Sequence, residues 1–324
     1  MNEVVVTAPA RLHFGMLDPA GLGARRFGGF GVGIESPRVA VAVRWAGPGP
    51  SDAVIVSGPQ AGRATTFARR AWSNLGLSSG VEVNVREAIP SHMGLGSGTK
   101  LGLAIARGIA GLAAISVGPE QLAQASGRGA RSSVGCWTFA APGLVIEAGV
   151  ADGGSISPLV ARHPMPERWR CVLALPLGLE GLSGDAEERF FGRLRESGHA
   201  EPSVSRLLLT ALLPGLLAGD IDEFGSALTR IQREVGSIFA AQQGGVFHPS
   251  AAPLVDALQA LGVRAVGQSS WGPAVYGIVD GPEQAAGVAD RLRATAGGGT
   301  DVSVVDFDRR GARISRGGSD RAAA

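Results

Sequence analysis

The sequence predicts an α+β fold of two lobes, in which mixed or antiparallel sheets carry helices packed against them. In the N-terminal third, apolar residues alternate with others, as in Val81, Val83 and Val85, which is the pattern of a half-buried strand. Apolar residues then recur at spacings of three and four between residues 101 and 115, which indicates one buried helical face. A stretch rich in Gly, Ser and Pro at 152–166 separates this half from a second one that again mixes helices and strands.

The individual elements follow from the same patterns. In the first half we expect strands at 4–7, 39–45, 54–56 and 81–85, and helices at 67–75 and 101–115. In the second half we expect strands at 169–175, 264–267, 275–279 and 302–307, and helices at 186–196, 204–213, 221–235, 252–261 and 283–295. These elements predict a first domain at residues 1–160 and a second at 161–308. Residues 309–324 are rich in Gly, Ser and Arg and predict a disordered tail.

Composition narrows the class of protein. The chain has 324 residues, 45% of them hydrophobic, which is ample for a packed core. Its formal net charge is only +2, and no basic run is interleaved with aromatic residues, so a nucleic-acid surface is not indicated. The two cysteines, the lack of a signal peptide and the lack of a long apolar run predict a cytoplasmic protein without a membrane span. Apart from Lys100, every basic residue among the 30 is arginine, and guanidinium groups suit phosphate or carboxylate ligands.

The most informative segment is a glycine-rich loop at 89–100, which follows an expected strand and opens the long apolar helix. Glycine lets the backbone approach a ligand closely, and the free N–H groups of a helix's first turn favour an anion. The expected phosphate contacts are Ser91, Gly94, Leu95, Gly96, Ser97, Gly98 and Thr99, followed by Lys100. Because the pattern is neither a Walker loop nor a dinucleotide fingerprint, a tight strand-to-helix turn without a ligand stays open as the alternative.

A second glycine-dense segment lies near the N-terminus and carries several polar residues. These residues are Arg11, His13, Asp18, Arg25, Arg26, Gly28 and Gly29. We expect a second anion-binding loop that faces the first. The alternative is a solvated hairpin loop in which the histidine is structural.

Two later segments combine glycine with polar side chains. One spans 127–133 and contains Arg128 and Arg131, and the other spans 267–273 and contains Ser269, Ser270 and Trp271. Both are predicted to line a binding pocket, and a surface turn and a plain loop are the respective alternatives. The Gly-Leu-Ser-Gly segment at 181–184 is followed by Asp185, which can act as the N-cap of the helix expected at 186–196.

Together these segments resemble the β-ribofuranosylaminobenzene 5′-phosphate synthase family, a branch of the GHMP kinase superfamily. Three segments resemble features of the superfamily, which are an N-terminal Pro-x-Arg segment, a glycine-rich phosphate loop and a glycine-containing C-terminal loop. They are Pro9-Ala10-Arg11, the loop Pro90 to Gly98, and Gly267 to Gly272. Six segments resemble the narrower branch and keep its order along residues 4–308: 11–15, 27–29, 94–99, 127–129, 181–184 and 267–273. The resemblance implies a two-lobed GHMP-kinase-like fold.

It also implies a phosphoribosyltransferase. Such an enzyme condenses 4-aminobenzoate or 4-hydroxybenzoate with phosphoribosyl pyrophosphate and releases CO₂ and pyrophosphate, in methanopterin biosynthesis. The resemblance further implies a homodimer. Which benzoate is the acceptor stays open, because three positions depart from the family's pattern. Lys100 stands where the pattern has glutamine, Ser133-Val134 replaces glycine-isoleucine, and 144–149 is a looser version of the expected strand.

The implied chemistry assigns roles to particular residues. The loop N–H groups and Lys100 are expected to stabilise the leaving pyrophosphate, which would carry Mg²⁺. Arg26 or Arg11 is expected to orient the acceptor carboxylate.

Three further roles follow from the same chemistry. His13 is expected to act in proton transfer, and Trp271 to stack on the aromatic ring. Asp18 is a candidate contact of the magnesium ion. The metal ligands themselves are not predicted.

Two other functions remain compatible with these motifs. The first is an ATP-dependent small-molecule kinase, although residues 120–151 contain no aspartate and only Glu120 and Glu147 as acids, which disfavours a catalytic aspartate there. The second is a non-catalytic protein that binds a phosphorylated metabolite.

Overall fold

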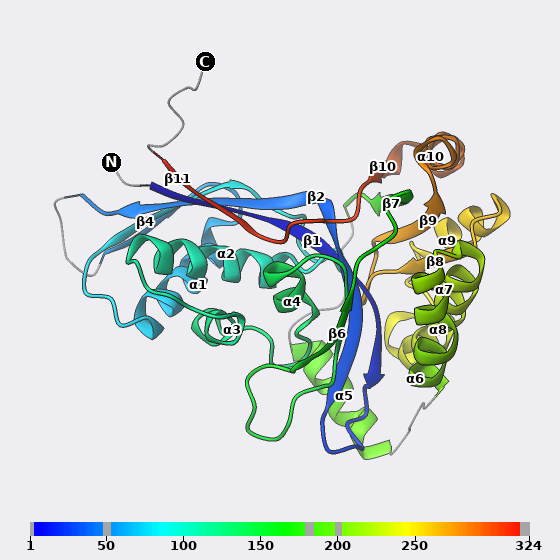
Figure 1. Ribbon diagram of the computed structural model, residues 1–324, viewed down its shortest axis with the longest axis horizontal. Helices are drawn as coiled ribbons and strands as arrows, with labels where there is room; N and C mark the ends of the chain where they lie inside the picture. Colours follow the sequence, from blue (N-terminus) through cyan, green and yellow to red (C-terminus); the bar gives the residue numbers. More distant parts are fainter. Residues whose placement is uncertain (1–2, 48–52, 179–184, 198–202, 318–324) are drawn as a thin grey trace.

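The fold consists of two lobes, each built on one sheet, and Figure 1 shows them side by side. The computed structural model describes residues 3–47, 53–178, 185–197 and 203–317. The segment 181–184, singled out in the sequence, lies outside the described residues. The prediction of an α+β fold with mixed and antiparallel sheets is confirmed.

The sheet of the first lobe is organised around two long antiparallel strands. Its strands are β1 (Glu3–Asp18), β2 (Phe27–Trp45), β3 (Val54–Ser57), β4 (Val81–Glu87), β5 (Leu144–Glu147), β6 (Leu159–His163) and β11 (Arg313–Gly317). They follow the order β11-β1-β2-β4-β3, with β5 paired to β2 and β6 to β5. Only β3 and β4 are parallel among the described strands of this sheet. β1 continues far beyond the expected strand at 4–7, with irregularities in its pairing to β2 between Pro9 and Ala10 and between His13 and Gly15.

Helices cover one face of this sheet, as Figure 1 shows. They are α1 (Ala61–Asn74), α2 (Ser97–Leu112), α3 (Pro119–Ser126) and α4 (Val134–Ala140). Tight packing holds α2 on the sheet, because a Cβ atom on Gly108 would lie 2.5 Å from Val43 Cγ2. The glycines that weaken α2 as an isolated helix therefore allow its close contact with β2.

The sheet of the second lobe is antiparallel and follows the order β10-β7-β9-β8. Its strands are β7 (Trp169–Pro176), β8 (Ala265–Gln268), β9 (Val275–Asp280) and β10 (Thr300–Val305). Its helices are α5 (Asp185–Ser197), α6 (Ser203–Leu207), α7 (Leu213–Ala218), α8 (Ile221–Gln243), α9 (Ala252–Ala260) and α10 (Pro282–Ala296), with a π-helical turn at Leu208–Leu212 and a 3₁₀ turn at Gly297–Gly299. None of the helices in the described part of the chain combines the length and apolar character needed to cross a membrane.

The hydrophobic core runs from one lobe into the other. Phe14 on β1 lies 5.2 Å, between ring centroids, from Tyr276 on β9. Both side chains are fully buried. The two lobes are therefore packed directly against each other, and the position of one sheet fixes the position of the other.

The end of the chain differs from the prediction. Residues 313–317 form β11, which pairs with β1 from Glu3 to Thr7, so the predicted disorder from 309 onward is wrong as far as residue 317. The predicted boundary at 160 is also shifted, because β6 reaches His163 and belongs to the first sheet. Every side chain of β11 is exposed, so its sequence lacks a burial pattern, and its pairing satisfies the backbone groups of an edge strand.

Removing residues 312–324 tests this pairing. We expect faster deuterium uptake in the β1 segment 3–7, because its amides lose their partners, with a stability loss of about 1 kcal/mol or less. Hydrogen exchange by mass spectrometry measures the uptake, and a chain that ends at residue 317 is the matched control. Equal uptake in both truncations would contradict the pairing.

Candidate active site

A cavity of about 330 Å³ lies where the two lobes meet. Its walls come from β1, the loop before α2, the segment 127–132, helix α8 and the loop after β8. Arg63 on α1, Phe191 on α5, the first turn of α2 and Phe247 after α8 also line it. Segments far apart in the sequence therefore build one site.

One end of the cavity is strongly basic. Arg11, Arg63, Arg128 and Arg131 all line it, together with His92. None of the described lining residues is Asp or Glu. Such a surface suits a ligand with several negative charges, because guanidinium groups match phosphate and carboxylate oxygens.

The glycine-rich loop has the geometry that the sequence predicts. Gly94 and Gly96 both adopt φ of +76°, a left-handed conformation that favours glycine. Helix α2 begins at Ser97 without a side-chain cap and without an acidic residue in its first turn. Its first N–H groups and the positive end of its dipole therefore suit an anionic ligand.

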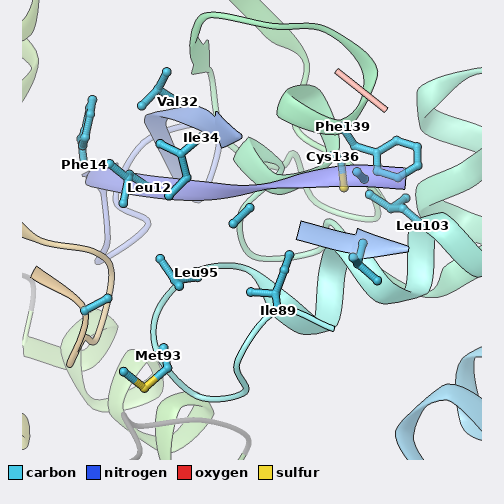
Figure 2. Packing of buried hydrophobic residues seen from close by; sticks show 14 of the residues in the cluster. Leu12, Phe14, Val32, Ile34, Ile89, Met93, Leu95, Leu103, Cys136 and Phe139 are labelled. Atoms are coloured by element: carbon cyan, nitrogen blue, oxygen red, sulfur yellow. The ribbon is translucent and has the colours of Figure 1, made fainter. Parts of the chain in front are cut away.

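Core packing and hydrogen bonds fix the loop backbone. Figure 2 shows Ile89, Met93 and Leu95 among the buried hydrophobic residues, so the loop is anchored by its apolar side chains. The Gly94 carbonyl oxygen accepts hydrogen bonds from the Arg11 guanidinium and, at 2.7 Å, from the Ser269 hydroxyl. One partner comes from each lobe, so the loop forms part of the joint between them.

Two arginines reach the first turn of α2. Arg63 donates a hydrogen bond to Ser91 Oγ at 2.8 Å, and its Nη2 lies 2.5 Å from the position that a Cβ on Gly98 would take. Arg128 donates to Thr99 Oγ1 at 3.3 Å from Nη2. These guanidinium groups repel each other and the positive end of the helix dipole, and an anion between them removes that repulsion.

The other end of the cavity is aromatic. Phe239 on α8 and Trp271 have ring centroids 4.5 Å apart at an interplanar angle of 35°, and Phe191 lies 6.1 Å from Trp271. Val235 and Phe247 add apolar surface. This end suits an uncharged ring, whereas the basic end suits phosphate.

His13 on β1 lines the same cavity. Its Nε2 is 3.0 Å from Ser132 Oγ. Burial, and then the positive charge of Arg11, lower its pKa to about 3. The imidazole is therefore neutral near neutral pH and serves as a hydrogen-bonding group rather than as a cation.

Most of the predicted binding residues do meet at the cavity. Those that line it are Arg11, His13, Gly94, Leu95, Gly96, Ser97, Gly98, Thr99, Arg128, Arg131, Ser270 and Trp271. Ser91 and Ser269 lie just behind this surface and hold Arg63 and the loop.

Lys100 does not reach the cavity. It is fully buried under α4, and its Nζ donates a hydrogen bond to Thr138 Oγ1 at 2.9 Å. Burial lowers its pKa to about 7, against the opposing influence of Asp308. The predicted contact with the leaving group is therefore absent here, because the lysine lies on the inward face of α2.

The turn between β1 and β2 does not form the second anion loop. The Asp18 carboxylate accepts hydrogen bonds from the backbone N–H groups of Gly21 and Gly23, both at 2.8 Å. Arg25 donates to a backbone carbonyl oxygen, and Arg26 lies 3.7 Å from the carboxylate of Asp152. None of these side chains lines the cavity, because β1 and β2 extend past it before the chain turns.

The two predicted glycines on β2 have structural roles instead. Gly28 adopts φ of +65° against the backbone of Ala148. A Cβ on Gly29 would lie 3.2 Å from His13 Cε1, so this glycine leaves room for the imidazole. Neither lines the cavity.

Several lining residues were not predicted from the sequence. They are Arg63, His92, Phe191, Gln232, Phe239 and Gln243, among others. Arg63 lies one turn before Phe67, just outside the helix predicted at 67–75, so a helix extended by one turn would have placed it beside the glycine loop.

No group of three or more His, Cys, Asp or Glu side chains that could hold a metal occurs in the described part of the chain. Asp18, the predicted magnesium contact, is engaged by its own turn. These residues do not fit a protein-held magnesium site.

The fold and the glycine loop place the chain among the GHMP kinases as a class. The family of GHMP kinases N terminal domains matches residues 61–137, and that of GHMP kinases C terminal domains matches residues 212–297. The solved structure of L. major mevalonate kinase in complex with R-mevalonate has a TM-score of 0.70 at 12% identity, over 94% of this chain and 96% of that chain. At that identity the likeness concerns the fold alone.

The sequence relatives define a narrower group. A protein of Archaeoglobus fulgidus named beta-ribofuranosylphenol 5′-phosphate synthase is 30% identical over 305 residues, covering 88% of this chain and 90% of that protein. A protein of Methanothermobacter thermautotrophicus with the same name is 29% identical over 305 residues, with 86% and 89% covered. The chain belongs to this family of enzymes, as its motifs indicated.

Replacing Arg63 by alanine tests the basic end of the cavity. We expect the affinity for inorganic pyrophosphate to fall about tenfold or more, because a charged hydrogen-bond donor to the anion is lost. Isothermal titration calorimetry measures the affinity. Arg69→Ala, an exposed arginine on the same helix, is the control and should bind as the parent protein does. Equal affinity in both variants would exclude Arg63 from the site.

Lys100→Met tests the buried lysine. Because the pKa of Lys100 is about 7 in the folded chain, against an ordinary value of 10.5, the unfolded chain binds more protons between these pH values. The unfolding free energy therefore rises with pH in this window, by at most about 1.4 kcal/mol per pH unit from this group. Urea unfolding across the window should show that Lys100→Met loses this slope. An identical slope in both proteins would contradict a neutral buried lysine.

Proposed function

We propose that the protein is a phosphoribosyltransferase that joins 4-hydroxybenzoate or 4-aminobenzoate to phosphoribosyl pyrophosphate, with release of CO₂ and pyrophosphate. One observation carries this proposal: a single cavity has four arginines at one end and an aromatic lining at the other. The name of the relatives, which describes a ribofuranosylphenol 5′-phosphate, fits a product with a phosphorylated sugar and an aromatic ring.

The basic end is assigned to the phosphate groups. The N–H groups at 96–99, with Arg63 and Arg128, hold the pyrophosphate and stabilise its charge as the bond to the sugar C1 breaks. In this proposal Arg63 and Arg128, and not Lys100, supply the positive charge that stabilises the leaving pyrophosphate. Arg131 also lines the cavity and is assigned to the 5′-phosphate.

The aromatic end is assigned to the benzoate. Its ring lies against Trp271 and Phe239, and its carboxylate faces Arg11. Arg11 lines the cavity two residues before His13 on β1. The ring carbon that carries the carboxylate forms the new bond to the sugar C1. The bond to the carboxylate carbon then breaks, and its electron pair restores the aromatic ring as CO₂ leaves. No net proton is consumed.

Further parts of the proposal follow from the resemblance of the motifs. They are a role in methanopterin biosynthesis and a homodimeric assembly. Magnesium would accompany the pyrophosphate and help to neutralise its charge, and no step is assigned to it.

Incubation with phosphoribosyl pyrophosphate, Mg²⁺ and carboxyl-labelled benzoate tests the function. We expect labelled CO₂ from 4-hydroxybenzoate, from 4-aminobenzoate or from both, because the carboxylate leaves in the proposed step. Parallel reactions with each benzoate identify the acceptor. Release of no label from either benzoate would overturn the proposal, and consumption of ATP with a panel of sugars and polyols would replace it with kinase activity.

A pair of variants ties the activity to this cavity. Phe239→Leu should raise the KM for the benzoate about two- to tenfold, because one wall of the aromatic end loses its ring. Phe224→Leu, a buried residue that does not line the cavity, is the matched control for the loss of a core ring. Equal KM values in the two variants would place the ring elsewhere.

A further inference from the structure

A buried hydrogen-bonded chain leads away from the cavity behind His13. His13 Nε2 lies 3.0 Å from Ser132 Oγ, and the Ser132 hydroxyl donates to Glu147 Oε1 at 2.8 Å. Glu147 is fully buried, and its two carboxylate oxygens also accept from the backbone N–H of Ser133, at 2.9 Å each. An acidic group is therefore enclosed in the fold one hydrogen bond behind Ser132, which itself lines the cavity.

This chain fixes which nitrogen of His13 carries the proton. The single hydrogen of the Ser132 hydroxyl is used toward Glu147, so in the His13–Ser132 bond the imidazole Nε2–H is the donor. The neutral ring then has no hydrogen on Nδ1, which is an acceptor. Among the described residues, no hydrogen bond reaches Nδ1.

The surroundings hold the ring in this orientation. Gly29 leaves space for the imidazole edge, because a Cβ placed on this residue would lie only 3.2 Å from His13 Cε1, and a larger residue would displace the ring. The backbone N–H of His13 donates to Ser269 Oγ at 3.0 Å, and its carbonyl oxygen accepts from Ser270 N–H at 3.2 Å. Backbone and side chain are thus both fixed.

In a cavity rich in donors, an acceptor selects a particular kind of group. The arginines and the loop N–H groups offer hydrogens to phosphate, whereas His13 Nδ1 requires a hydroxyl or an amine. His13 lies two residues from Arg11 on β1, and its carbonyl oxygen accepts from the N–H of Ser270, the neighbour of Trp271, so it is close to both the basic and the aromatic residues. In the proposed reaction the sugar C1 lies there too, since pyrophosphate leaves toward one end and the ring attacks from the other.

We propose that Glu147 and Ser132 are positioning residues that hold His13 as the Nε2–H tautomer, so that its Nδ1 accepts a hydrogen bond from the 2-hydroxyl of the bound ribose 5-phosphate moiety. This inference rests on the proposed function, because it uses the place of the sugar C1. The 2-hydroxyl is attached to the carbon next to C1. A neutral acceptor on this hydroxyl stabilises the positive charge that develops at C1, and bonds of this type strengthen in the transition state of glycosyl transfer. The lowered pKa of His13 is consistent with a ring that stays neutral.

Binding of two simple sugar phosphates tests the assignment without turnover. Titration calorimetry of ribose 5-phosphate against 2-deoxyribose 5-phosphate should show about fivefold tighter binding of the ribose compound, the factor expected of one neutral hydrogen bond. In Ser132→Ala and Glu147→Gln the ratio should fall toward one, while Ser132→Thr, which keeps the hydroxyl, should restore it. Ser237→Ala and Glu120→Gln, both exposed, are matched controls and should keep the ratio of the parent protein.

Nitrogen-15 NMR of the imidazole groups gives a second readout that a purely structural role would not change. The His13 signals should show the Nε2–H tautomer in the parent protein and a mixture of tautomers in Ser132→Ala. Equal affinity of the parent protein for the two sugars, a ratio that survives in Ser132→Ala and Glu147→Gln, or the opposite tautomer would each overturn the inference. The first of these results leaves the proposed reaction intact if labelled CO₂ is formed, whereas no binding of either sugar and no labelled CO₂ would remove both.

Discussion

The carbonyl oxygen of Gly94 is the point on which the architecture of the site depends. It is held by Arg11 from the first lobe and by Ser269 from the second. A buried backbone carbonyl must be paired, so these bonds fix the loop, and the loop fixes the direction in which α2 begins. The basic wall and the aromatic wall of the cavity keep their separation because both are attached to this joint.

The distribution of charge follows from the same arrangement. The guanidinium groups of Arg63 and Arg128 lie at the end of α2 where the helix dipole is already positive. This arrangement is unfavourable without a ligand, and its repulsion becomes binding energy for a polyanion. By contrast, burial keeps His13 neutral, so the cavity wall at His13 differs in character from the basic end. Two environments within one cavity suit a substrate pair in which one member is charged and the other is aromatic.

The chain also shows how a family motif is kept while individual side chains take other roles. Lys100 directly follows the glycine loop in sequence, yet it is buried against Thr138 and does not line the cavity. Arg26 directly precedes the segment 27–29 that resembles the family, yet it lies beside Asp152 outside the cavity. Glu147, noted in the sequence only as an acid in a region without aspartate, is connected to His13 through Ser132. The sequence motif therefore predicts where the loop lies, but being next to a motif in sequence does not put a side chain in the cavity.

Local patterns in the amino-acid sequence suffice for the α+β class, the main helices and strands, and the glycine loop at the start of α2. These patterns are alternation, helical spacing and the conformational freedom of glycine at Gly94 and Gly96. Packing between distant segments, by contrast, settles that Arg63 faces the loop, that β11 returns to β1, and that Asp18 and Arg26 lie outside the cavity. Exposed strands and arginines carry no burial pattern, so their partners depend on how the long strands and the packed lobes bring remote parts of the chain together.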